Sequence, residues 1–117
     1  MVKVRRIVAD LAASNPGDVA KFYQAIFDLD VLMDMEWIVT LGADESAPVQ
    51  LSLAQEGGSG APVPHLSIEV DDLDTVLERV KARDVPIIYP VTKEPWGVRR
   101  FFIVDPGGRV LNVLSHI

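Results

Sequence analysis

Apolar residues recur at every third or fourth position in two stretches of the chain, residues 17–27 and 72–82. This spacing places the apolar side chains on one face of an amphipathic helix. Typical start signals precede both stretches: Asn15, followed by a proline, before the first, and an aspartate, Asp71 or Asp72, before the second. The sequence therefore predicts one helix in each half of the chain.

Short apolar or alternating runs, which are typical of strands, lie before and after each predicted helix. One run precedes each helix, at residues 2–11 and 63–71, and three runs follow it. The following runs are at about 30–34, 36–42, 48–54, 86–91, 98–105 and 109–116. Each half of the chain therefore has the order β-α-β-β-β.

The repeated order predicts two similar modules, at about 1–54 and 63–117, joined by a flexible glycine-rich linker at 55–62. The length of 117 residues fits a single domain with a core large enough to fold without covalent cross-links. In each module the helix covers one face of a four-stranded sheet. The other face must pack, pair with another subunit or line a pocket.

Composition narrows the class of protein. The apolar fraction of 49% is ordinary for a globular protein, and the absence of cysteine excludes disulfides, thiolate metal sites and cysteine nucleophiles. No apolar run approaches 18 residues, so we expect no membrane-spanning helix. Asp10 ends the first apolar stretch too early for a signal peptide, and the sequence therefore predicts a cytoplasmic protein.

The charge balance argues against nucleic acid as a partner. The formal net charge is −6, and basic residues form no stripe with interleaved aromatic residues. Arginine pairs at 5–6 and 99–100 are local exceptions. Such isolated pairs favour a small anionic ligand over a polyanion.

The paired β-α-β-β-β order, the Phe22 and Tyr23 pair and the C-terminal "WGVRRFFIVDPGGRVLNVLSH" resemble the vicinal oxygen chelate superfamily. This group includes glyoxalase I, bleomycin-resistance proteins, fosfomycin-resistance proteins and extradiol dioxygenases, and the resemblance covers essentially the whole chain. It implies an α+β fold in which both modules form a mixed, incompletely closed, barrel-like sheet with the helices outside, and it implies a homodimer. The fold hosts many chemistries, so the resemblance leaves the reaction open.

Polar residues interrupt the apolar strands at equivalent places in the two modules. Gln50 and Asn112 lie within the last strands, and alignment of the first strands puts Arg6 opposite His65. In metal-using members of the resembled superfamily, the ligands come from these strands, on the concave sheet face. We therefore expect these four side chains to line a cavity built from both halves.

The four side chains form a poor set of metal ligands. A divalent metal usually takes three or four imidazole, carboxylate or thiolate ligands. His65 is a good ligand, Gln50 and Asn112 are weak neutral ones, and Arg6 cannot ligate at all. The sequence thus favours no metal; if Zn, Ni, Fe or Mn binds, the ligands would be His65, Gln50 and Asn112.

Two residues near the C-terminal strand pair complete the candidate site. Trp96, in "PWGVRR", would stack on a flat ligand. Arg100 shares a strand face with two apolar residues and is expected at the cavity rim. Asp10 and Glu69, at equivalent strand positions, are expected to be solvated rim charges. His116 is expected to be exposed.

Each candidate residue has a structural alternative. For His65 the alternative is a solvated residue at the start of a strand, and for Arg6 it is a place on the surface. For Gln50 and Asn112 the alternative is to satisfy buried backbone groups, and for Trp96 it is to cap the end of the sheet or to lie in a dimer contact.

Two functions are consistent with these residues. The first is a metal-independent binder of an anionic or flat organic molecule in a concave cavity. The alternative is a divalent-metal-dependent enzyme, either a glyoxalase-like lyase or a dioxygenase-like enzyme. The sequence identifies no catalytic residue, and it leaves open whether a reaction is catalysed at all.

Overall fold

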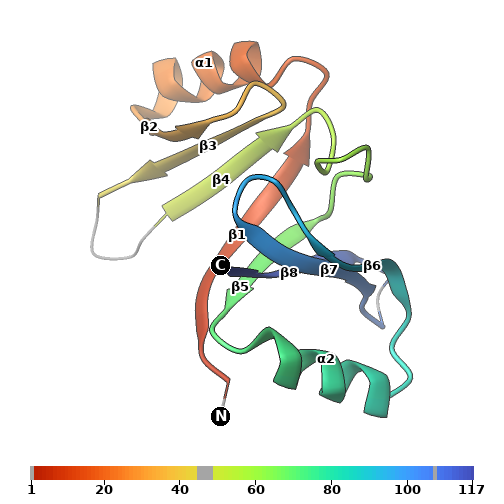
Figure 1. Cartoon of the computed structure of the whole chain (residues 1–117). Coiled ribbons are helices and arrows are strands. Elements are labelled where there is room, and N and C mark those ends of the chain that lie inside the picture. The colour runs from red at the N-terminus through yellow and green to blue at the C-terminus, as the bar shows by residue number, and fades with distance from the viewer. Residues whose placement is uncertain (1, 45–48, 107) are drawn as a thin grey trace. The chain divides into compact units, whose positions relative to one another are not determined.

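The computed structural model describes residues 2–44, 49–106 and 108–117, and it contains the expected element order twice (Figure 1). The first half contains β1 (Val4–Ala12), α1 (Pro16–Phe27), β2 (Asp30–Asp34), β3 (Ile38–Ala43) and β4 (Val49–Ala54). The second half contains β5 (Leu66–Val70), α2 (Leu73–Ala82), β6 (Ile87–Lys93), β7 (Val98–Val104) and β8 (Val110–His116).

The chain forms two compact units. The N-terminal unit is Val8–Val63, and the C-terminal unit is Pro64–Ile117 together with the first residues of the chain up to Ile7. β1 therefore begins in one unit and ends in the other. The sequence-based module limits, at 1–54 and 63–117 with the linker at 55–62, stay predictions.

Hydrogen bonding places the eight strands in the order β2-β3-β4-β1-β5-β8-β7-β6. The pairs β1–β4 and β5–β8 are parallel, whereas β2–β3, β3–β4, β6–β7 and β7–β8 are antiparallel. Among the described residues, β2 and β6 are the end strands, and hydrogen bonds do not close the sheet. The α+β class with a mixed, open sheet is thus confirmed.

The start of α1 follows the sequence signals. The Asn15 side chain accepts a hydrogen bond from the backbone N–H of Asp18 at 3.3 Å, which satisfies one of the unpaired donors of the first turn. The helix ends at Asp28, whose φ of 55° lies in the left-handed region. Its inner face packs on the N-terminal core, which contains Ala20, Val39, Leu41 and Leu53.

The start of α2 has a closely similar cap. Asp72 accepts hydrogen bonds from the Thr75 backbone N–H at 3.0 Å and from the Thr75 hydroxyl at 2.7 Å. These bonds stabilise the ionised carboxylate, so they hold the pKa of Asp72 below its ordinary value.

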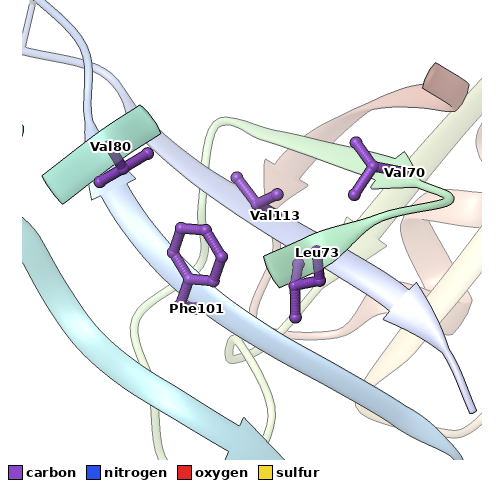
Figure 2. Close-up of a cluster of buried hydrophobic side chains, with 5 residues drawn as sticks. All are labelled: Val70, Leu73, Val80, Phe101 and Val113. Carbon is purple, nitrogen blue, oxygen red and sulfur yellow. The ribbon is translucent and has the colours of Figure 1, made fainter. Parts of the chain in front are cut away.

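α2 covers one face of the C-terminal strands. Figure 2 shows the buried cluster beneath it, in which Phe101 of β7 and Val113 of β8 meet apolar side chains from β5 and α2. The cluster consists of Val70, Leu73, Val80, Phe101 and Val113. Since side chains alternate along a strand, residues 67, 100, 102 and 112 face away from α2. We call this second surface the helix-free face.

The two end strands differ in their backbone. β6 contains Pro90, and its pairing with β7 shifts register on both sides of Tyr89. β2 pairs with β3 through one irregularity, between Val31 and Met33, and all five of its residues are exposed. Neither helix of the described chain is long and apolar enough to cross a bilayer.

Candidate functional site

The helix-free face of the C-terminal unit carries polar residues on neighbouring strands. Asn112 on β8 lies between two residues of the neighbouring strands. Its Cα partners are Ser67 of β5 on one side and Phe102 of β7 on the other. Two residues further along β8, Leu114 lies between Glu69 and Arg100 in the same way. The strand register therefore brings hydrophilic side chains from three strands onto one surface.

Asn112 is 8% exposed, and only half of its amide is satisfied by the protein. Its Nδ2 donates to the Ser67 hydroxyl at 3.1 Å. Its Oδ1 is buried and accepts no hydrogen bond from the described residues. A buried polar atom without a partner costs about 1–3 kcal/mol and is uncommon in native proteins, so this oxygen marks a place where a further donor would be stabilising.

Glu69 contacts two basic side chains on the same face. Its Oε1 lies 3.4 Å from Nε of Arg6, and its Oε2 lies 3.0 Å from Nδ1 of His116. The Arg6 side chain is 38% exposed, whereas neighbouring Arg5 points to the opposite side of β1. Glu69 is only 16% exposed, so its expected role as a solvated charge is wrong. His116 is exposed, as expected.

Arg100 is enclosed within the C-terminal unit. Its Nε and Nη2 lie 2.7 and 2.6 Å from Oε2 of Glu94, which also accepts a hydrogen bond from the Tyr89 hydroxyl at 2.9 Å. The guanidinium carbon lies about 5 Å from three ring centroids, those of Tyr89, Trp96 and Phe102. The Arg100 and Glu94 side chains are 3% and 2% exposed. Arg100 thus lies on the expected strand face, but its charge is balanced internally.

Trp96 precedes β7 in a tight turn and is half-buried. One side of its ring system meets the Arg100 guanidinium, a cation–π arrangement that holds the ring in place. The structure therefore joins two of the expected ligand contacts, Trp96 and Arg100, into one cluster.

His65 lies immediately before β5 and is exposed. Its ring Nδ1 accepts a hydrogen bond from the Val110 backbone N–H at 3.0 Å, and the backbone N–H of His65 donates to the Val110 carbonyl at 2.8 Å. Only Nε2 of this ring is left for a further contact. Gln50 is half-buried on β4 in the N-terminal unit, and its expected place opposite Asn112 stays a prediction.

Sequence reasoning missed a buried polar row in the N-terminal unit. Thr40 and Ser52 share a 2.7 Å hydrogen bond between β3 and β4, and Asp10 is the Cα partner of Ser52 on β1. Asp10 is 8% exposed, so the expectation of a solvated charge is wrong. Strand parity carried the signal, because Asp10 shares its side of β1 with the buried Val8.

The donor set does not fit a divalent metal. Within residues 2–44, 49–106 and 108–117, no three or more histidine, aspartate or glutamate side chains gather closely enough to hold an ion. The pair formed by Glu69 and His116 has the Arg6 guanidinium beside it, which would repel a cation. Nδ1 of His65 is already engaged by the backbone.

A cavity of about 420 Å³ opens beside His116 at the N-terminal end of α2. Lys93, Arg99 and Ser115 contribute to its lining, together with the aspartates that precede and begin the helix. Arg99 and Asp74, which form an ion pair, both line this cavity. Arg99 and Ser115 lie on the α2 side of their strands, so among the lining residues only His116 belongs to the helix-free face.

Comparison with known proteins agrees with this architecture. Residues 4–113 match the sequence profile described as Glyoxalase/Bleomycin resistance protein/Dioxygenase superfamily. The sequence matches no curated protein.

Several solved structures share the fold. A methylmalonyl-CoA epimerase from Streptomyces coelicolor is 16% identical, with a TM-score of 0.70 over 97% of this chain and 99% of that one. A Legionella pneumophila protein described as an NAD-dependent benzaldehyde dehydrogenase is 19% identical, with a TM-score of 0.79 over 96% and 100%. A Vibrio splendidus member of the superfamily is 18% identical, with a TM-score of 0.66 over 98% and 100%. At these identities the similarity extends to the fold alone.

Proposed function

The chain belongs to the glyoxalase/bleomycin resistance protein/dioxygenase superfamily, and from this membership we propose that it binds a small organic anion on its helix-free face without a metal ion. The observation that carries the proposal is the partly satisfied Asn112 amide on the same face as Arg6. A surface that needed only to pack would be served better by an apolar residue at position 112.

Arg6 is the proposed anion contact. A guanidinium has five N–H donors, so Arg6 can bind a carboxylate or phosphate while its Nε stays directed at Glu69. Its side chain is partly exposed, and the 3.4 Å separation from Glu69 is longer than a strong hydrogen bond. Arg100 is a less suitable anchor, because Glu94 already neutralises it.

Trp96 would supply apolar surface to a flat ligand, since its contact with Arg100 fixes the ring orientation. His65 and Gln50 stay proposed contacts, the former through Nε2. The residues available as metal ligands support the metal-independent part of the proposal. The Arg6 guanidinium lies beside the Glu69 carboxylate, and within the described chain no group of three anionic or imidazole side chains lies close enough together to hold an ion.

Titration of the purified protein with benzoate tests the proposed function, with binding followed by calorimetry. We expect Arg6→Gln to weaken binding about 10-fold or more, because it removes a charge-assisted contact worth about 1.5–3 kcal/mol. The matched control is Arg5→Gln, which removes the same charge from the opposite side of β1 and should bind like the wild type. Equal weakening in both variants would mean that only net charge matters, and the proposed site would be abandoned.

We also propose that the protein is a homodimer. α1 supports this proposal because three of its large apolar residues, Phe22, Ile26 and Phe27, are about 60% exposed. Phe22→Gln should shift the protein towards the monomer in sedimentation velocity, whereas Lys21→Gln, on another side of the same helix, should not. A wild-type protein that sediments as a monomer at high concentration would refute the dimer.

A further inference from the structure

The buried Oδ1 of Asn112 constrains the chemistry of the ligand as well as its place. Nδ2 of the same amide already donates a hydrogen bond to the Ser67 hydroxyl, so a neighbour on β5 sets the orientation of the amide. The neighbour on β7 is Phe102, which has no polar side-chain atom. Along β8, the next residues on the same face are Val110 and Leu114, which are also apolar.

The neighbouring positions on this face therefore present no side-chain donor to Oδ1. We propose, on the basis of the proposed function, that the ligand itself carries an O–H or N–H group that donates to Oδ1 of Asn112. This donor lies at the end of the ligand opposite its anionic group. A ligand without a donor would leave the oxygen unpaired and would bind less tightly.

The strand register sets the spacing of the two ends. Asn112 is paired with Ser67, and Glu69, which contacts Arg6, lies two residues further along β5. Two residues of a strand span about 7 Å, so the donor and the anion of the ligand are separated by roughly that length. Leu114, the β8 partner of Glu69, lies along this stretch of the face and is apolar, whereas Phe102 lies on the other side of Asn112, on β7.

A flat, apolar spacer with a hydroxyl at one end and a carboxylate at the other meets these requirements. The proposed ligand class is therefore a small aromatic or similarly rigid carboxylic acid with a donor opposite the acid. para-Hydroxybenzoate is a suitable probe, and para-methoxybenzoate is its matched analogue, since it keeps the oxygen but lacks the hydrogen. Benzoate lacks both.

The experiment measures the affinity of these three acids for the wild type, Asn112→Leu and Asn112→Asp. We expect the wild type to bind the hydroxy acid at least about 5-fold more tightly than the methoxy acid, as expected for a buried hydrogen bond that cannot be made. Asn112→Leu should lose this preference while still binding benzoate. Asn112→Asp keeps an acceptor oxygen at the same place and should retain the preference.

The outcomes separate the inference from the function on which it rests. If benzoate binds in an Arg6-dependent manner but the hydroxy and methoxy acids bind the wild type equally, the donor is refuted and the anion site stands. A preference for the methoxy acid would show that apolar contact decides the affinity and that no donation to Oδ1 takes place, which also overturns the inference. If none of the acids binds, the proposed function fails.

Discussion

The enclosed pair of Arg100 and Glu94 makes a sharp prediction about stability. We consider Glu94→Leu, Arg100→Met and the double variant. Both side chains are almost completely buried, so solvent does not screen their interaction. Removal of one partner leaves the other charge buried without its counter-ion, which costs about 3–5 kcal/mol in the free energy of unfolding.

The double variant should be much less destabilised than the single variants. Replacement of a buried ion pair by apolar residues of similar volume is often neutral or stabilising, by about 1–4 kcal/mol. Tyr89 loses its acceptor in Glu94→Leu and in the double variant, which adds about 1–3 kcal/mol to both. The coupling energy between the two positions should therefore be at least about 3 kcal/mol.

Urea unfolding followed by tryptophan fluorescence is the assay. The chain has two tryptophans, Trp37 in the N-terminal unit and Trp96 beside Arg100. In a Trp37→Phe background the signal reports the surroundings of Trp96 alone. Wild type, single variants and double variant form a complete thermodynamic cycle in this background.

The exposed pair of Arg99 and Asp74 is the matched control. Its side chains are 37% and 74% exposed, so Asp74→Leu should cost no more than about 1 kcal/mol. If Glu94→Leu costs as little as Asp74→Leu and the coupling is near zero, the charges of Arg100 and Glu94 are solvated and the reasoning is refuted.

Three further predictions follow from the core, the α2 cap and the donor set. Phe101→Ala should cost about 3–5 kcal/mol in urea unfolding, whereas Leu32→Ala, on the exposed strand β2, should cost far less. The pKa of Asp72 is lower in the folded protein than its ordinary value of 3.8, so the stability that this cap contributes is fully present above pH 3.8 and is lost as the pH falls through the folded-state pKa. Hydrogen exchange at the start of α2 should show this loss. Asp72→Asn should abolish the pH dependence of that exchange. Elemental analysis after exposure to zinc, nickel, iron or manganese should find no stoichiometric metal, and a metal that is lost in His65→Ala would restore the enzyme alternative.

The sequence predicts the elements well because each is specified locally. Apolar spacing identifies both helices, and the caps at Asn15 and Asp72 form as the residue types require. Strand alternation also separates Arg100 from Arg99, since one is buried and the other pairs with Asp74 on the helix side.

The partners of the site residues were harder to predict. Glu94 precedes β7 in a turn, outside any strand period, so alternation does not show that it meets Arg100. The position of Tyr89 depends on register shifts within β6, which the residue types do not reveal. Asp10 was accessible to the same parity argument as Arg100, but its charge favoured a solvated position over a buried one.

The contrast between the two end strands bears on how the protein behaves in concentrated solution. A proline has no backbone N–H, so Pro90 and the uneven pairing of β6 make that edge a poor template for another chain. β2, with the sequence DVLMD, has no proline, and strand addition there is discouraged by its terminal aspartates and by the single irregularity between Val31 and Met33. Aggregation of this protein would therefore begin at β2, and a lysine in place of Leu32 is the substitution that would protect that edge.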